Sequence, residues 1–319
     1  MQIQTVTGLI PVENIKVADG HGHVWISPPE GVKPDARLVL DNARLIEAEL
    51  KDFRSAGGDT IIDCQPGGCG RDARMLVKLA EAAQLYITAV TGYHLQRYYP
   101  SGYWLWSASE EEAAAYFMEE IVGGMRETDG AVPATAIKVG YDGTFKEQNR
   151  VLLEAAAEAA RQTGAPLLFH TEEGQNVEAL PLFFEDRGVS SRRLYFCHMD
   201  KRPDLGLHRE LAQAGVLLGY DTFIRPNYKP EKGVWPLLAE MVRQGCGRSI
   251  AIGLDMAASA RWRHYQGQPG LVALLDQIIP RLRAENIEDA MIDRLIGPNV
   301  AERLAKAGIG DERLEKNGE

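Results

Sequence analysis

Five side chains that can bind metal ions stand at the ends of apolar segments in this sequence of 319 residues. His21 and His23 flank one glycine, and residues two apart in a strand project to the same side, so both imidazoles can reach one cation. A His-x-His pattern alone is weak, because ordinary strands also contain it. His170, His198 and Asp255 strengthen it, because each ends a later apolar segment. Together they predict a metal site.

Lys138 lies inside another apolar segment, AIKVG, where burial makes an isolated ammonium costly. It could pair with a carboxylate, form a Schiff base, or react with CO2 to give a carbamate that bridges two cations. A cationic amine beside two cations is disfavoured, whereas a carbamate is anionic and suits them. The sequence therefore favours N6-carboxylysine at Lys138, with a salt-bridged lysine as the remaining interpretation.

Eight apolar segments must position these residues, and we expect strands at 15–24, 59–65, 85–94, 134–142, 165–171, 193–199, 215–222 and 249–256. Helical periodicity occurs between them, at 35–57, 109–125, 149–164 and 202–215. The alternation, without a break in composition, predicts one α/β domain over residues 1–319, a (β/α)8 TIM barrel. Barrel enzymes carry their catalytic groups at the carboxyl ends of strands, where four histidines and Asp255 would fall.

Several local signals refine this outline. Asp72, Ser109 and Asp204 are expected to cap helices, and Arg71 is expected to pair with a neighbouring carboxylate. The polar tail beyond about residue 307 is expected to fray.

Composition restricts the partners. Acidic residues exceed basic ones by 45 to 35, giving a net charge of −10, which disfavours nucleic acid. No basic and apolar leader is visible, and no apolar stretch approaches the ~18 residues of a membrane span. The cysteines form no CxxC pair, which is typical of free thiols in a reducing compartment. We expect a cytoplasmic protein that acts on a small molecule, without a membrane or nucleic-acid partner.

The order of these residues, HGH at the first strand, Lys at the fourth, His at the fifth and sixth and Asp at the eighth, resembles the amidohydrolase superfamily. The segments TVTGLIPVE, DCQPGGCGRD, TGYH, HTEEG and GPNVAERL resemble, more narrowly, the phosphotriesterase-like lactonase family, over almost the whole chain. The resemblance implies two divalent ions, usually zinc, and a homodimer. His21, His23 and Asp255 would bind the buried ion, His170 and His198 the outer one, and Lys138 both.

Two positions depart from the family pattern. Gly22 stands where relatives often have Glu, and Met199-Asp200-Lys201 follows His198 where a small residue, Gly and Asp are usual. Neither departure removes a metal ligand. We therefore expect these two changes to affect the residues around the ligands and the wall of the substrate pocket.

Two such cations ~3.5–4 Å apart lower the pKa of a bridging water and polarise the electrophile. The expected reaction is attack of the bridging hydroxide on a carbonyl or phosphoryl centre, with Asp255 passing the proton to the departing alkoxide.

The loops after the seventh and eighth strands, 222–233 and 256–269, resemble those of lactonases that act on phosphorylated sugars. The resemblance implies that Lys229, Arg261 and Tyr265 bind the substrate. Arg225 and Arg263 are further basic candidates, and His94 would lie beside the reacting group. Solvated loop cations are the alternative interpretation.

The sequence thus favours a binuclear hydrolase that opens lactones, among them phosphorylated sugar lactones. A phosphotriesterase or another ester or amide hydrolase on the same scaffold is the first alternative, and a binding protein without catalysis is the second. A sugar isomerase is disfavoured, because such centres use carboxylates and need no lysine on the fourth strand.

Overall fold

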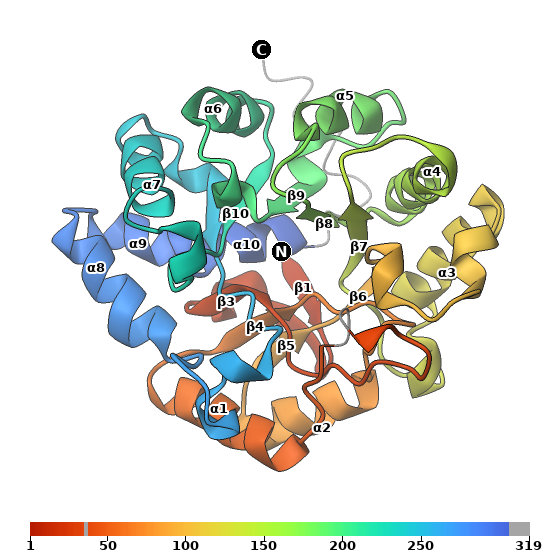
Figure 1. Cartoon of the computed structure of the whole chain (residues 1–319), viewed down its shortest axis with the longest axis horizontal. Helices are drawn as coiled ribbons and strands as arrows, with labels where there is room; N and C mark the ends of the chain where they lie inside the picture. The colour runs from red at the N-terminus through yellow and green to blue at the C-terminus, as the bar shows by residue number, and fades with distance from the viewer. Residues whose placement is uncertain (35–37, 306–319) are drawn as a thin grey trace.

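The computed structural model describes residues 1–34 and 38–305, and it confirms the predicted (β/α)8 barrel (Figure 1). The polar tail lies outside the described residues. The strands are β1 (Gln2–Thr5), β2 (Gly8–Pro11), β3 (Ala18–Gly22), β4 (Thr60–Asp63), β5 (Tyr86–Thr88), β6 (Val90–Gly92), β7 (Ala136–Tyr141), β8 (Leu167–Thr171), β9 (Leu194–Cys197), β10 (Leu217–Tyr220) and β11 (Ile250–Ile252). The helices are α1 (Ala43–Ser55), α2 (Ala73–Ala83), α3 (Glu110–Val122), α4 (Glu147–Thr163), α5 (Leu180–Glu185), α6 (Leu205–Gln213), α7 (Val234–Arg243), α8 (Ile279–Ala284), α9 (Asp289–Leu295) and α10 (Pro298–Leu304).

The barrel wall consists of parallel strands in the orders β3-β4-β5 and β6-β7-β8-β9-β10-β11. The predicted third strand is interrupted at Ala89 into β5 and β6. Between β11 and β3, the Asp255 amide donates to the His21 carbonyl over 2.7 Å. The first and last strands of the barrel are therefore neighbours, although no continuous ladder joins them.

The helices begin where polar side chains cap them. Asp72, Ser109 and Asp204 accept from backbone amides in the first turns of α2, α3 and α6, as predicted. The first predicted helix is shorter than expected, because Asn42 caps it and Leu40 pairs with Ile26 in an antiparallel bridge. Periodicity alone extended that helix backwards over 38–42, and the first predicted residues, 35–37, lie outside the described part of the chain.

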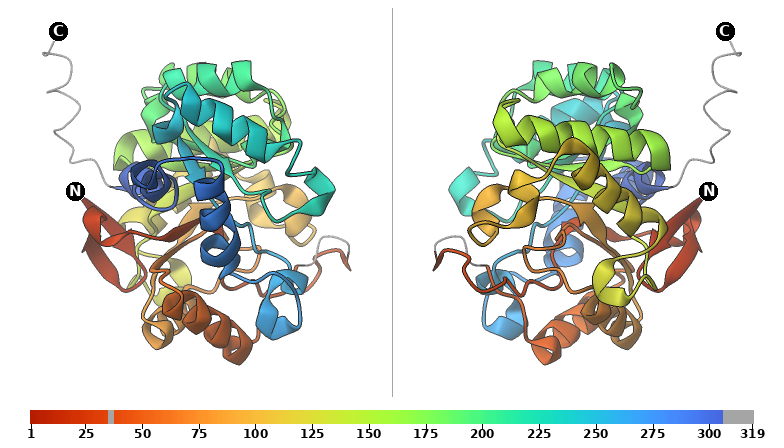
Figure 2. Two further views of the ribbon diagram at one scale, coloured as in Figure 1. Left: turned by 90° about the vertical axis from the view of Figure 1, so that its left-hand side faces the viewer. Right: turned by 90° about the vertical axis from the view of Figure 1, so that its right-hand side faces the viewer.

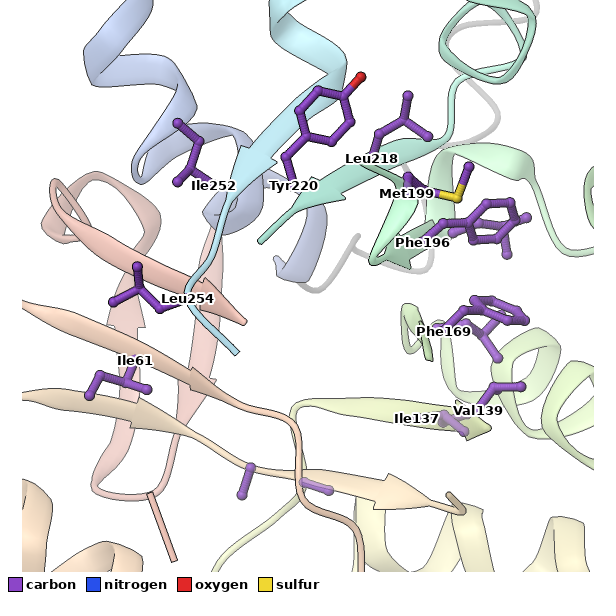
Figure 3. Close-up of a cluster of buried hydrophobic side chains, with 14 of the residues drawn as sticks. Ile61, Ile137, Val139, Phe169, Phe196, Met199, Leu218, Tyr220, Ile252 and Leu254 are labelled. Atoms are coloured by element: carbon purple, nitrogen blue, oxygen red, sulfur yellow. The ribbon is translucent and has the colours of Figure 1, made fainter. Parts of the chain in front are cut away.

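Apolar side chains fill two separate layers. Those on the outer face of the strands pack against the helices, as Figure 3 shows for Ile137, Phe169, Phe196 and Leu218, among others. A second cluster fills the barrel interior with small and medium side chains such as Ala18, Ile62, Val90, Ala136, Leu168, Leu217 and Ala251. The interior is therefore a packed core rather than a channel.

The amino end of the barrel is covered by a hairpin that the sequence reading did not anticipate. β1 and β2 pair antiparallel, and Ile3 joins the interior cluster together with Val300 and Leu304 of α10. Figure 2 shows this hairpin on the side opposite the loop after β3. The carboxyl ends of the strands are consequently the open face.

Arg71 forms a buried ion-pair cluster beside α2, which confirms its predicted carboxylate contact. Its guanidinium donates to Glu120 over 2.6 and 2.9 Å, to Glu127 over 2.6 and 2.8 Å, and to the Val90 carbonyl over 2.7 Å. This cluster ties the loop after β4 to α3. All four cysteines are free thiols, and none of the described helices is long and apolar enough to cross a bilayer.

Candidate metal centre

The barrel brings the predicted ligands together at the carboxyl ends of its strands. His21 lies in β3 and His23 just beyond it, Lys138 in β7, and His170 in β8. His198 follows β9, and Asp255 lies three residues beyond β11. His21, His23 and Asp255 offer ligand atoms within 4.8 Å of one another, and the His170 and His198 ring centroids are 4.6 Å apart.

Two of these residues have unusual backbone conformations. His198 has φ 64° and Asp255 has φ 48°, in the left-handed region that is uncommon for residues other than glycine. Such conformations cluster at functional sites, where the surrounding structure holds them. Here each follows the end of a strand and turns the chain at the barrel mouth.

One buried carboxylate fixes the protons of two histidines. Asp221, which follows β10, accepts from His21 Nδ1 over 3.0 Å and from His198 Nδ1 over 2.9 Å. A neutral ring that donates its Nδ1 proton carries a lone pair on Nε2. Burial lowers the pKa of His21, but the charge of Cys64 and the hydrogen bond to Asp221 raise it to about 10, so a metal ion would displace the second proton of this ring. A ring nitrogen with a free lone pair is the form of histidine that binds metals.

The other two histidines each have an acceptor of their own. His23 Nδ1 lies 3.0 Å from Gln65 Oε1, whose orientation is set because Gln65 Nε2 donates to the Cys69 carbonyl over 2.6 Å. His170 Nε2 donates to Glu172 over 2.9 Å. The lone pairs of His23 Nε2 and His170 Nδ1 are thereby left for another partner.

These lone pairs meet at positions suited to cations. His170 Nδ1 and His198 Nε2 face each other over 2.9 Å although their protons are on the opposite nitrogens. Two lone pairs at this distance repel unless an electron-pair acceptor lies between them. His21 Nε2 is buried, and it has no hydrogen-bond partner in the described part of the chain. The donor set of imidazoles and carboxylate therefore fits divalent metal ions, zinc in particular.

Lys138 has an equally unsatisfied amine. Its side chain is fully buried, and Nζ has no hydrogen-bond or ion-pair partner among the described residues. Burial and the charge of Lys138 both lower the pKa of His170, which places the amine near the histidines. The contact that a salt-bridged lysine would make is therefore missing, while a carbamate would complete the ligand set.

The charges of the site suit metal binding. Burial lowers the pKa of His23 and His198, and that of His170 to about 4, so these rings are neutral at neutral pH. Burial alone would raise the pKa of Asp255, but the charge of Arg225 lowers it well below the ordinary value. Neutral imidazoles and an ionised carboxylate are the forms that bind divalent ions.

His94 lines the same space with a fixed proton position. Its Nδ1 accepts from the Leu95 amide over 2.7 Å, so the proton of the neutral ring is on Nε2. Burial lowers its pKa well below the ordinary value, and the charge of Lys138 acts in the same direction. The ring is thus a hydrogen-bond donor rather than a base.

A cavity of about 420 Å³ opens above the histidines and is lined by His94, Arg225 and Arg261 among the predicted substrate residues. Lys229 and Tyr265 do not line it. Lys229 is exposed on the loop after β10, and the Tyr265 hydroxyl accepts from the Asn42 amide over 2.8 Å. Arg263 is also turned away, because it pairs with Asp276 over 3.0 Å.

The site contains several residues that the sequence did not predict. Lys201, Tyr228 and Arg97 line the cavity, and Lys201 Nζ lies 5.3 Å from the centre of the Tyr228 ring. Lys201 belongs to the segment noted only as a departure from the family pattern. Gln65 and Asp221 lie at the carboxyl ends of the predicted strands 59–65 and 215–222, so their positions resembled those of the ligands and could have been noticed.

Comparisons with known proteins agree on one family. The model of the phosphotriesterase family matches residues 1–303. A phospho-furanose lactonase of Mycoplasmopsis synoviae is 27% identical, over 92% of this chain and 89% of that protein. An N-acetyltaurine hydrolase of Xenopus tropicalis is 24% identical, over 93% and 96%. The crystal structure of a lactonase from Listeria monocytogenes matches in fold with a TM-score of 0.90 at 20% identity, covering 97% of this chain and 100% of that one.

Proposed function

Because this chain belongs to the phosphotriesterase family, we propose that it is a zinc-dependent lactonase whose substrates carry a phosphate group. The proposal rests above all on two positively charged side chains, those of Lys201 and Arg261, which line the cavity above the histidines. Neither side chain has a carboxylate partner among the described residues. Burial is the main cause that lowers the pKa of Arg261, and the charge of Arg225 lowers it further. Such a pair is suited to a substrate anion.

The histidines, Lys138 and Asp255 would hold two metal ions as the family resemblance implies. When bound, the ions would acidify a water molecule and polarise the carbonyl of the substrate. Lys138 would serve as a carbamate, formed when its ammonium loses a proton and the resulting neutral amine attacks CO2 and releases a second proton. This modification turns an unsatisfied amine into an anionic oxygen ligand.

The chain's own groups account for the remaining steps. Asp255 would accept the proton from the attacking water as the new bond to the carbonyl carbon forms. It would return this proton to the ring oxygen as the carbon–oxygen bond of the lactone breaks, which gives a hydroxy acid. His94 would donate its Nε2 proton in a hydrogen bond to a substrate oxygen. Arg261 and Lys201 would hold the phosphate away from the reacting carbonyl.

An amide hydrolase for anionic N-acyl compounds is a second candidate. The relatives include an N-acetyltaurine hydrolase, and Lys201 and Arg261 would suit a sulfonate as well as a phosphate. A triesterase is disfavoured, because phosphotriesters are uncharged and would leave both cations unpaired.

The test is a panel of substrates assayed with protein purified in the presence of zinc and bicarbonate. It would contain phosphorylated sugar lactones, the same lactones without phosphate, N-acetyltaurine and an organophosphate triester. We expect the highest kcat/KM for a phosphorylated lactone, by at least tenfold over its unphosphorylated form. Equal values would refute the phosphate assignment, and a preference for N-acetyltaurine would favour the second candidate.

A binding protein without catalysis predicts a different result from metal analysis. It would contain less than one metal ion per chain after the same purification, whereas we expect two. Homodimer formation and a cytoplasmic location stay predictions.

A further inference from the structure

Asp221 contacts two histidines that we assign to different metal ions, although it is not itself a proposed ligand. We propose that Asp221 is a positioning residue that couples the two metal sites, so that the affinity of each site depends on the same carboxylate. This inference rests on the metal centre of the proposed function.

The two histidines share one oxygen of Asp221. Its Oδ2 lies 3.0 Å from His21 Nδ1 and 2.8 Å from His198 Nδ1, and it also accepts from the His198 amide over 3.2 Å. The other oxygen, Oδ1, lies 2.9 Å from His198 Nδ1. The carboxylate is fully buried, so no water competes for these hydrogen bonds. A carboxylate behind a ligating imidazole fixes the ring orientation and raises its basicity.

Asp200 holds the backbone that carries the Asp221 carboxylate. Its Oδ2 accepts from the Asp221 amide over 3.0 Å and from the amide and hydroxyl of Thr222, each over 2.7 Å. The chain at the end of β10 is thereby fixed. Asp221 cannot easily turn toward one histidine without weakening its bond to the other.

A shared and rigid acceptor has a thermodynamic consequence. When a metal ion binds His21, it polarises the ring and strengthens the Nδ1 hydrogen bond to Asp221. This hydrogen bond orders the carboxylate that also orients His198, so the second binding step requires less reorganisation. Such coupling between two sites is reciprocal.

The other two histidines provide matched controls, because each has an acceptor that contacts no other histidine, although Glu172 also accepts from Arg97 over 2.7 Å. Gln65 accepts from His23 and Glu172 accepts from His170. Removal of either acceptor should affect one metal site, whereas removal of Asp221 should affect both. The three variants are therefore expected to weaken different metal sites of the same centre.

The experiment is a titration of the metal-free protein with Cd²⁺ in bicarbonate buffer. Calorimetry would give the affinities, and ¹¹³Cd NMR would give one resonance for each site. We expect Asp221→Asn to weaken both sites by about 10- to 100-fold. Gln65→Met should weaken the site of His23, and Glu172→Gln the site of His170. Melting temperatures of the metal-free variants would separate a general loss of structure from these effects.

Two other results would contradict us in distinguishable ways. If the wild type binds two ions and Asp221→Asn weakens one site or neither, the coupling is wrong and the metal centre stands. If the wild type binds fewer than two ions, the metal centre itself is wrong, and the inference fails with it. If Asp221→Asn does not fold, Asp200→Ala is the variant to test. This substitution releases the turn that holds Asp221, and it should weaken both metal sites by a smaller factor.

Discussion

Arg225 donates from one guanidinium nitrogen to both the side-chain carboxylate and the backbone carbonyl of Asp255. The same nitrogen lies 3.3 Å from the Leu254 carbonyl. Arg225 belongs to the loop after β10, and Asp255 to the segment after β11. The two loops that line the cavity are therefore joined at the residue that we expect to carry the proton.

Loss of this guanidinium should shift the pH dependence of catalysis. Burial alone raises the pKa of Asp255, and Arg225 is the largest influence that lowers it. In Arg225→Met the pKa of Asp255 should rise, so the acid limb of the kcat profile should move to higher pH, and kcat should fall about tenfold. Arg263→Met is the control, because Arg263 pairs with Asp276 instead. An unchanged acid limb would speak against the role of Arg225.

Asp255→Asn should abolish most turnover, because the amide cannot accept the proton of the attacking water. The expected loss in kcat is on the order of 10²- to 10⁴-fold, the usual contribution of a general base. Some metal should remain bound, since the histidines are unchanged. Steady-state kinetics with parallel metal analysis would check this. Near wild-type kcat on the true substrate would rule out the proton transfer.

Lys138 should make metal reconstitution depend on CO2. We expect the metal-free wild type to regain activity with zinc faster in bicarbonate than in CO2-depleted buffer. Lys138→Ala should have little activity in either buffer. Short carboxylic acids such as propionate should restore part of it, because they can occupy the space of the carbamate. A wild type indifferent to bicarbonate, together with an active Lys138→Ala, would exclude the modification.

Arg261 and Lys201 should discriminate between phosphorylated and unphosphorylated lactones. A hydrogen bond to a charged group contributes about 1.5–3 kcal/mol, so Arg261→Ala and Lys201→Ala should each lower kcat/KM for the phosphorylated lactone by about 10- to 100-fold. The unphosphorylated lactone should be affected little. Lys229→Ala is the matched control, because Lys229 is exposed and does not line the cavity. A large effect of Lys229→Ala would instead restore the assignment made from the sequence.

His208 should make folding stability depend on pH. It is fully buried between the Tyr220 hydroxyl at 2.6 Å and the Arg202 carbonyl at 2.9 Å, and burial lowers its pKa from 6.5 to about 4. Between these values the unfolded chain binds a proton that the folded chain does not, so stability falls as the pH falls. The loss approaches about 3 kcal/mol at pH 4.

Urea unfolding of the wild type and His208→Gln at several pH values would measure this contribution. The variant should be less stable at pH 7 but should have a flatter pH dependence between pH 6.5 and 4. His264→Gln serves as the control, because His264 is partly exposed. A wild type and a His208→Gln variant with equal slopes would contradict the assignment.

The sequence was sufficient for the barrel and for the residues that face the proposed metals. Apolar strands of regular spacing determine the barrel, and a residue at the end of such a strand must lie at its open face. His170, His198 and Asp255 could be placed for this reason alone. The hairpin β1–β2 was not predicted, because its two strands precede the first β/α unit and no α-helix lies between them.

The surroundings of the site could not be predicted in the same way. Whether a loop cation points into the cavity depends on contacts distant in the sequence. Tyr265 is held by Asn42, more than two hundred residues away, whereas Lys201 enters the cavity from a turn behind His198. The hydrogen-bond partners of the histidines likewise come from neighbouring strands, and no local pattern in the sequence reports them.

The hairpin and α10 cover the amino end of the barrel, so the site is open to solvent at the carboxyl ends of the strands. Ile3, Val300 and Leu304 continue the packed interior downward from the strands, so the described residues offer no second passage beneath the histidines. Substrate and product must therefore use the same entrance in turn. Under the proposed function, a ring-opened product that keeps its phosphate and gains a carboxylate would leave past Lys201 and Arg261 more strongly charged than it arrived. Departure of the product, rather than cleavage, would then limit the cycle at high substrate concentration, and added salt would speed turnover there.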